Sequence, residues 1–263
     1  MIIKSLRDHL RTLVGWTIGL SAFMSMYLGI YGSIKDDPQT YSAQAMAKYP
    51  GALRDLMGGL NDIASGTGYL QSVAYQLFVP ALLSACAMIL ANRSLAGPEE
   101  AGTLELVVTL PVSRRRLVLE RFAALALGLL AVAVVTFAVA WAMTRAVGMD
   151  VSFGRLLAAH TGVYLLALCF GTVTLAVGAA TGRKAVASAV LGAWAVLGYM
   201  VVTVGRNVDA VSWLKWVSPF HYYGEGRPLY QGLPAGDYLV LAGATAVLAL
   251  IAVLAFDRRD VGV

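Results

Sequence analysis

One glycine-rich run in this sequence invites comparison with a nucleotide-binding loop, because its glycines are followed by a lysine. The run is Gly178-Ala179-Ala180-Thr181-Gly182-Arg183-Lys184-Ala185. A phosphate-binding loop needs a fixed spacing between its glycines and the lysine, followed by a Ser or Thr whose hydroxyl binds Mg²⁺. Here the spacing differs, and Ala185 stands in the hydroxyl position. We therefore expect no nucleotide site in this chain, and we interpret the run as a helix end tethered by Arg183 and Lys184.

The side chains most often used in catalysis and metal binding are few and scattered. The chain has three histidines, His9, His160 and His221, and two cysteines, Cys86 and Cys169, each cysteine inside a long apolar run. No spacing among them is typical of a metal site or a disulfide framework. We predict structural roles for these side chains, with no catalytic residue and no metal site.

The composition indicates a membrane protein. Hydrophobic residues make up 59% of the chain and charged residues 13%, and the mean hydropathy is +0.71. A soluble domain carries roughly 25% charged residues, because its surface must face water. A bilayer removes that requirement, since side chains that face lipid are apolar. The net charge of +5 then suggests contact with anionic headgroups, and we expect no nucleic-acid partner.

Six apolar runs are long enough to cross about 30 Å of hydrocarbon as helices. They occupy residues 12–33, 69–91, 122–144, 154–180, 186–205 and 237–256. The first run follows basic residues, as a signal peptide does, but it is longer than a signal core and lacks a clear cleavage site. We expect it to be retained. The sequence predicts an all-α polytopic protein with six transmembrane helices in a single domain, 1–263.

The distribution of basic residues predicts the orientation of these helices, because cytoplasmic loops carry an excess of Lys and Arg. Twelve basic residues fall in the N-terminus, the 92–121 loop, the 181–185 turn and the C-terminus, and eight fall on the other side. The first set is Lys4, Arg7, Arg11, Arg93, Arg114, Arg115, Arg116, Arg121, Arg183, Lys184, Arg258 and Arg259, and the second is Lys35, Lys48, Arg54, Arg145, Arg155, Arg206, Lys215 and Arg227. Both termini are therefore predicted to lie in the cytosol.

The interiors of the predicted spans contain no carboxylate. Proton- and sodium-coupled carriers usually place Asp, Glu or His chains inside the bilayer, so we expect the energy for any transport to come from elsewhere. Gly15 and Gly19 form a GxxxG pattern in the first span, which permits close contact with another helix.

Two outer segments have their own patterns. In the 34–68 loop, Leu53, Leu56, Met57, Leu60 and Ile63 recur at helical spacing. This pattern predicts an amphipathic helix on the outer membrane surface or against the outer ends of the spans. The 206–236 segment holds Trp213, Trp216, Phe220, Tyr222, Tyr223 and Tyr230, which we interpret as an aromatic belt at headgroup level or, alternatively, as a substrate contact.

The 92–121 loop predicts a short helix with a sharp stop. Pro98, Glu99 and Glu100 suit a first turn, and Leu104, Val107 and Val108 share one helical face. Pro111 prevents the helix from continuing, and Ser113 suits the N-cap of the next helix. Arg114 to Arg116 oppose that helix's dipole, so we expect anionic lipid or an acidic partner to hold them.

Residues Glu99 to Leu106, with Leu110 to Arg114, resemble the first cytosolic loop of type-2 ABC exporter permeases. Two further segments agree with the resemblance, Trp216 to Tyr223 with Pro228 and Leu229, and Phe256 to Asp260. In that family the loop forms a coupling helix that docks into a groove of an ATPase subunit. The residues that the resemblance assigns to this contact are Glu99, Glu100, Gly102, Thr103, Leu104, Glu105, Val107, Val108, Pro111 and Arg114.

The resemblance implies a permease half in the plasma or inner membrane that works with a second permease subunit, either identical or different, and with two cytosolic ABC ATPase subunits. ATP and magnesium would bind only to those partners. Few polar groups line the spans, which favours an amphipathic or lipid-like substrate. The alternatives are a non-transport assembly factor or sensor subunit on the same scaffold, and an intramembrane enzyme, which lacks residues for chemistry.

Overall fold

The computed structural model describes residues 2–36, 48, 63–104, 113–205 and 209–259. The described residues form helices and no strands. The long helices are α1 (Ile2–Asp36), α5 (Val79–Ser94), α8 (Arg114–Ala146), α9 (Phe153–Thr181), α10 (Lys184–Val204) and α13 (Ala235–Arg258). Short helices link or extend them: α4 (Gly66–Tyr69), the π-helix η2 (Leu70–Phe78), α6 (Ala96–Glu100), the 3₁₀-helix η3 (Asp209–Val217), α11 (Pro219–Gly224) and α12 (Pro228–Gln231).

Six helical stretches are long and apolar enough to cross a membrane, as the sequence predicts. They are Ser5–Asp36, Gly66–Ser94, Arg114–Ala146, Phe153–Thr181, Lys184–Thr203 and Ala235–Arg258. Several extend beyond their predicted bounds. The hydropathy pattern ends at the first charges, whereas backbone hydrogen bonds continue through polar residues outside the hydrocarbon. With 33 residues at 1.5 Å each, α8 is roughly 50 Å long and exceeds the hydrocarbon thickness.

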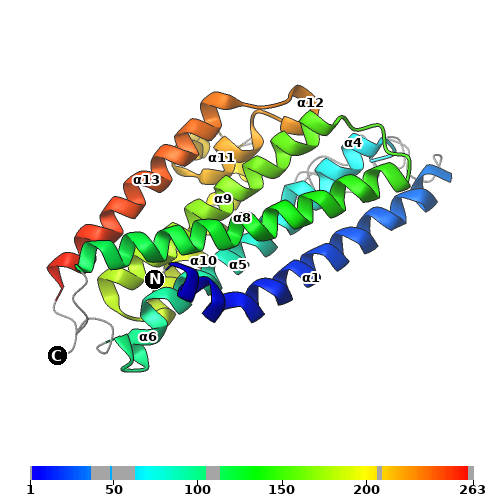
Figure 1. Cartoon of the computed structure of the whole chain (residues 1–263). Coiled ribbons are helices and arrows are strands. Elements are labelled where there is room, and N and C mark those ends of the chain that lie inside the picture. Colours follow the sequence, from blue (N-terminus) through cyan, green and yellow to red (C-terminus); the bar gives the residue numbers. More distant parts are fainter. Residues whose placement is uncertain (1, 37–47, 49–62, 105–112, 206–208, 260–263) are drawn as a thin grey trace.

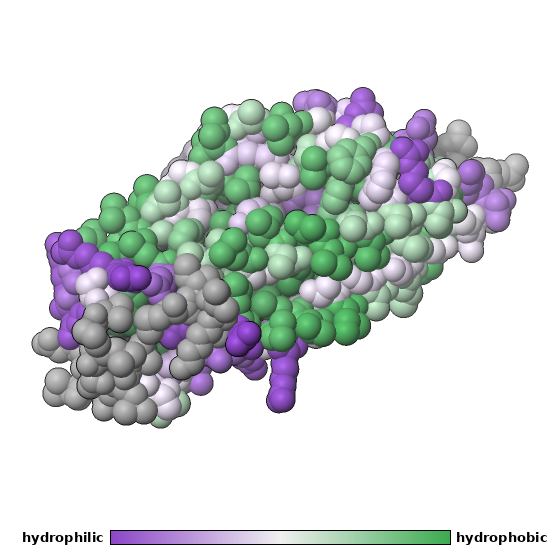
Figure 2. All heavy atoms as spheres, in the orientation of Figure 1, coloured by the Kyte–Doolittle hydropathy of each residue, from purple (hydrophilic) through white to green (hydrophobic). Residues whose placement is uncertain are grey.

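The helices form one bundle in which α9 is central. In its most apolar 18-residue stretch 78% of the residues are buried, against 17% in the corresponding stretches of α1 and α10. Large apolar side chains on α1, α10 and α13 face outward. Figure 2 shows the result, an apolar band along the middle of the molecule with hydrophilic residues gathered towards its two ends. This distribution suits a bilayer, because lipid contacts the band and water or headgroups contact the ends.

The bundle has two ends, which are called the α6 end and the α11 end after short helices that belong to them. The first turns of α1, the start of α8, the α9–α10 junction and the last turn of α13 lie at the α6 end (Figure 1). Arg121 donates to Ser5 Oγ at 3.1 Å, and Arg93 donates to Thr12, so α1 is bonded there to both α8 and α5. The short helices α4 and α12 lie towards the opposite end, called the α11 end.

Some predictions about the α11 end cannot be compared with the structure. Of the predicted amphipathic helix, Leu53, Leu56, Met57 and Leu60 lie outside the described residues, and Ile63 packs against the core. The aromatic segment is divided. Trp213 and Trp216 are 64% and 59% exposed, as a belt requires, whereas Tyr223 is buried.

The GxxxG pattern of the first span makes no close helix contact within the described bundle. A Cβ added at Gly15 or at Gly19 would meet no described atom within 4 Å. Both glycines therefore face away from the described helices.

The second span is less regular than the sequence predicts. Its residues Leu70–Phe78 form a π-helix before α5 begins. Pro80 is the second residue of α5, and proline lacks the N–H that would bond to the carbonyl four residues earlier. Insertion of a wider turn before proline accommodates this missing bond. The π-helix directs Tyr75 into the bundle, where this side chain is fully buried.

Tyr75 belongs to a buried polar cluster that joins three helical elements. Its hydroxyl lies 2.9 Å from Nδ1 of His160 on α9, and Nε2 of His160 lies 3.1 Å from Thr136 Oγ1 on α8. Thr136 Oγ1 also donates to Val132 O at 2.9 Å. Thr136 therefore accepts from Nε2–H, and Nδ1 accepts from the tyrosine. Both ring nitrogens of His160 are satisfied, which supports the structural role predicted for this residue.

We predict that Tyr75→Phe destabilises the bundle by about 1 kcal/mol or more, because it leaves Nδ1 of buried His160 without a partner. The matched control is Tyr164→Phe, which removes a 3.3 Å bond from a half-buried tyrosine to Ala126 O. That carbonyl lies within a helix and keeps its helical partner. Thermal unfolding in detergent should show the larger loss of Tm for Tyr75→Phe. Equal Tm values for the two variants would contradict the role assigned to the cluster.

Candidate functional site

The α6 segment is a single turn of helix that projects from the bundle end. Helix α5 ends at Ser94, and Leu95 (φ −130°) bends the chain before α6 begins at Ala96. Pro98 lies in the first turn, where its missing N–H has no helical partner to lose. Gly102 then takes a left-handed conformation (φ +66°), and Thr103 N and Oγ1 both donate to Pro98 O, at 2.9 and 3.0 Å.

This turn corrects part of the sequence interpretation. The sequence predicts one helix running from Pro98 past Val108, whereas α6 ends at Glu100 because Gly102 reverses the backbone direction. Leu104 is again helical and is 0% exposed, packed in the core of this chain. It therefore does not share an open face for a partner. Glu105, Val107, Val108 and Pro111 lie outside the described residues.

The exit from the loop is as predicted. Ser113 has an extended backbone, and its hydroxyl accepts from Arg116 N at 3.4 Å. It is thus the N-cap of α8, the role that Ser has at helix starts. The loop between α5 and α8 is therefore anchored at both ends on membrane-spanning helices.

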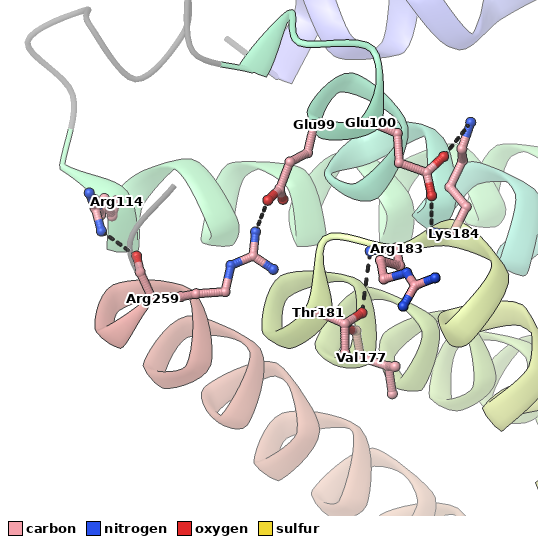
Figure 3. A network of polar contacts seen from close by, with 8 residues as sticks. All are labelled: Glu99, Glu100, Arg114, Val177, Thr181, Arg183, Lys184 and Arg259. Carbon is pink, nitrogen blue, oxygen red and sulfur yellow. Dashed lines mark hydrogen bonds and ion pairs between the residues drawn. The ribbon is translucent and has the colours of Figure 1, made fainter. Parts of the chain in front are cut away.

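Two glutamates fasten α6 to two different helices (Figure 3). Glu100 Oε2 lies 3.0 Å from Nζ of Lys184, and its Oε1 accepts from Lys184 N at 2.7 Å. Lys184 is the first residue of α10. Glu99 pairs with the guanidinium of Arg259, which follows α13. Both glutamates therefore have basic partners within the chain, 84 and 160 positions away.

The two pairs differ in their surroundings. Glu100 is exposed, and the Lys184 ammonium that donates to it lowers the pKa of its carboxyl, with a further contribution from Lys184 N–H. A carboxyl with a lowered pKa keeps its bonds at neutral pH and loses them as the pH falls through that lowered value. The Glu99 and Arg259 side chains are only 22% and 20% exposed, so water screens this pair less than an exposed one.

Gly182 makes room for the Glu99–Arg259 pair. It ends α9 in a left-handed conformation (φ +68°), with its N–H donating to Gly178 O at 2.8 Å. A Cβ at this position would lie 2.5 Å from Glu99 Oε1 and 2.9 Å from Arg259 Nη2. The run first compared with a nucleotide loop is thus a helix C-cap, followed at once by α10. Both its conformation and its contact require glycine.

The arginines at the start of α8 have partners in this chain, rather than only the lipid or acidic protein expected from the sequence. Arg114 donates to Arg259 O at 2.6 Å, and Nε and Nη2 of Arg115 donate to Asp257 Oδ2 at 2.9 Å. Arg116 pairs with Glu120 at 2.9 Å along α8 itself. Cations are unfavourable at a helix N-terminus, and Asp257, Glu120 and the carbonyl of Arg259 offset this effect for the three arginines.

The sequence alone does not predict partners within the chain for Lys184, Asp257 and Arg259. In the structure Lys184 and Arg259 pair with the α6 segment, and Asp257 pairs with Arg115 at the start of α8. Their charge was a signal, but the choice of partner depends on the packing of distant helices. No group of three or more His, Cys, Asp or Glu able to hold a metal ion occurs among the described residues. The ion pairs connect α6 directly to the start of α10 and to the residue that follows α13.

Comparison with known proteins identifies the family of the chain. A family model described as ABC-2 family transporter protein matches residues 1–261 of the chain, which include all the helices described above. The curated proteins give no match.

We predict that Gly182→Ala destabilises the protein by about 1–2 kcal/mol through backbone strain and also loosens α6, because the new methyl group displaces the Glu99–Arg259 pair. Gly148→Ala is the matched control, since Gly148 has nearly the same φ (+69°) but its nearest described atom is Lys35 Nζ at 3.5 Å. Hydrogen exchange should rise in residues 96–103 only for Gly182→Ala. The same exchange in both variants would show that the methyl group does not disturb the pair.

Proposed function

The chain belongs to the ABC-2 family of transporter proteins, and we propose that it serves as the permease of an exporter for an amphipathic or lipid-like substrate. Family membership makes it the membrane subunit of an ABC transporter, which works with an ABC ATPase subunit and lacks an ATPase domain of its own. Outward transport and the class of substrate belong to the proposal. So do two ATPase copies, a second permease subunit, identical or different, and a location in the plasma or inner membrane.

The observation that carries the proposal is the attachment of α6. Residues Glu100 to Thr103 are exposed at the tip of a short, rigid turn, and ion pairs join that turn to α10 and to the end of α13. A permease without a nucleotide site must receive work through protein contact. A turn that is exposed on one side and bonded to two spans on the other can transmit that work. We assign it the coupling role, with ATP and magnesium on the partner.

The coupling role requires the α6 end to face the cytosol. The concentration of basic side chains supports this orientation, because Arg93, Arg114 to Arg116, Arg121, Arg183, Lys184, Arg258 and Arg259 all belong to segments at the α6 end. Basic residues in short loops favour the cytoplasmic side.

Helix α10 is the span best suited to move when α6 is displaced. Only 17% of its most apolar stretch is buried, so few packed contacts oppose its displacement. At the α6 end it is bonded through Lys184 to Glu100 and through Ser188, which accepts from Asn92 at 2.8 Å. A push on α6 therefore reaches the first turns of α10 directly, through the ion pair at the start of that helix.

A groove between α5 and α10 supports an apolar pathway. It has a volume of about 320 Å³ and is lined almost entirely by apolar side chains, among them Met88, Phe170, Leu191 and Met200. Ser84 and Tyr199 supply its hydroxyl groups. Since the groove opens on the surface of one subunit, a second permease subunit would close it into a pathway. Such a pathway suits acyl chains or an amphipathic drug better than a sugar or an ion.

The first test locates the ATPase. We predict that Ala101→Cys, at the exposed tip of the α6 segment, forms a cross-link to the ATPase subunit in the purified complex. Leu233→Cys is the control, because Leu233 is 62% exposed but precedes α13 at the other end of that helix. A band specific to Ala101→Cys is expected on denaturing gels. Cross-linking from Leu233, or none from Ala101 in a complex that copurifies, would refute the assignment.

The second test concerns transmission of force. We predict that Glu100→Gln and Lys184→Gln keep the ATPase bound but slow ATP-driven movement of a labelled phospholipid away from the α6 side by several-fold. Each removes the ion pair between α6 and α10 and leaves only uncharged hydrogen bonding between them. The measurement uses proteoliposomes, with copurification as the assembly control. Arg116→Gln is the matched variant, since its pair with Glu120 stays within α8. Equal transport in all three variants would exclude this tether as the coupling path, and labelled lipid accumulating on the α6 side would contradict export.

A further inference from the structure

A charged cavity of about 260 Å³ lies at the α11 end, away from the α6 segment. It is formed by the last turns of α10, by η3, and by α11 with the link that follows it. The charged or titratable side chains that line it are Lys215, His221, Glu225 and Arg227, and the remaining lining is Val201, Val202, Gly205 and Gly224. None of these residues takes part in the coupling site.

The cavity carries an excess of positive charge and a polar atom without a partner. Lys215 and Arg227 are cations, whereas Glu225 is the one carboxylate in the described lining and its side chain is 56% exposed. His221 is 4% exposed, and its Nδ1 has no hydrogen-bond partner among the described residues. The nearest carboxylate oxygen, Glu225 Oε2, lies 3.5 Å from that nitrogen, beyond a good hydrogen bond.

An unpartnered buried nitrogen is unfavourable unless something binds it. With its hydrogen on Nδ1, the His221 ring donates one bond to an anion, and the ammonium and the guanidinium supply the others. Charge-assisted bonds of this kind are the usual means by which proteins hold phosphate groups. The composition of the lining thus points to a ligand with a negatively charged head.

The cavity is rigid on the side that carries His221. Ser218 Oγ donates to Gly198 O at 2.9 Å, which bonds the start of α11 to α10. Tyr223 OH donates to Tyr75 O in the second span, and burial raises the pKa of Tyr223 well above its usual value, so this hydroxyl stays a donor. The His221 ring lies edge-on to Trp216, with centroids 4.7 Å apart. Its position is therefore set before any ligand arrives.

Arg227 has a backbone conformation that arginine rarely adopts. Its φ of +40° is the only positive value among the described residues other than glycine, and such a conformation costs on the order of 1–3 kcal/mol. Tyr230 N and Gln231 N both donate to its carbonyl, at 2.9 and 3.0 Å, and these bonds hold the residue in place. Arg227 is one of the residues that line the cavity.

The charged cavity adjoins the apolar groove. Phe220 lines the groove and His221 lines the cavity, and on α10 the groove reaches Met200 while the cavity begins at Val201. Trp213 and Trp216 are exposed beside the cavity, as indole rings are at the headgroup level of a membrane. A single ligand with a charged head and apolar chains therefore matches both features at once.

We propose that this cavity binds the phosphate of an anionic phospholipid, whose acyl chains lie in the groove between α5 and α10. The proposal rests on the proposed function in one respect. If the chain is an exporter, the site implies that its substrate is an anionic lipid, which it moves to the α11 end. The binding itself needs no ATPase, so it is measured on the permease alone. A lipid head and free phosphate share the same chemistry, and the experiment separates them.

The test titrates the purified full chain, in neutral detergent, with dioctanoyl phosphatidylglycerol, dioctanoyl phosphatidylcholine or inorganic phosphate, and measures affinity by native mass spectrometry. We expect tighter binding of phosphatidylglycerol than of either comparator. Arg227→Asn and Lys215→Gln should each weaken it by about tenfold, the effect of losing one charge-assisted bond. Asn tolerates positive φ, so Arg227→Asn removes the charge without adding strain.

Two further variants keep the test decisive. Arg155→Gln removes an exposed cation from the start of α9, outside the cavity, and should leave the affinity unchanged. Glu225→Gln removes the one described carboxylate of the lining and should raise the affinity, a gain that misfolding does not produce. Equal affinity for the two lipids would overturn the assignment to an anionic lipid, and binding of inorganic phosphate without binding of phosphatidylglycerol would overturn the assignment to a lipid. An unchanged affinity in Arg227→Asn, as expected for Arg155→Gln, would also overturn the proposal. A chain that binds phosphatidylglycerol but transports no lipid would contradict lipid as the exported substrate and leave the binding site standing.

Discussion

The hydrocarbon interior of a bilayer offers no hydrogen bonds, so every peptide group that crosses it must find its partner within the protein. This constraint explains why long helices dominate the described chain and why the interiors of the predicted spans hold no carboxylate. The same constraint acts on His160. Its two nitrogens contact Tyr75 and Thr136, so this buried ring joins three helical elements and leaves neither nitrogen without a partner.

The constraint also moves charge to the ends of the bundle, and each end then has a distinct character. At the α6 end the charges pair with one another. Glu99, Glu100, Arg115 and Lys184 all have partners on other elements, so the polar groups join α6, α8, α10 and α13 into one mechanical unit. At the α11 end the cavity is lined by two cations, Lys215 and Arg227, and by His221, whose Nδ1 has no hydrogen-bond partner among the described residues.

Helix α10 links the two ends. It starts at Lys184, bonded to the α6 segment, passes along the apolar groove, and ends beside the charged cavity. Its low burial follows from its position at the edge of the bundle, where it covers α9 on one face only. A helix with few packed contacts can change its tilt at small energetic cost, and α10 in this way connects the proposed ATPase contact at one end to the proposed lipid site at the other.

The number, order and approximate bounds of the six spans were readable from the sequence, because hydropathy over about 20 residues is a local property. The N-cap at Ser113 was readable for the same reason, since capping depends on the next three residues. The sequence did not show that the predicted helix would be divided at Gly102. Glycine permits the left-handed conformation but does not require it. The burial of Leu104 and the partners of Glu99 and Glu100 depend on how helices 84 to 160 residues apart are rotated and tilted against each other. Only the tertiary structure sets those angles, because they follow from the packing of all the helix faces together.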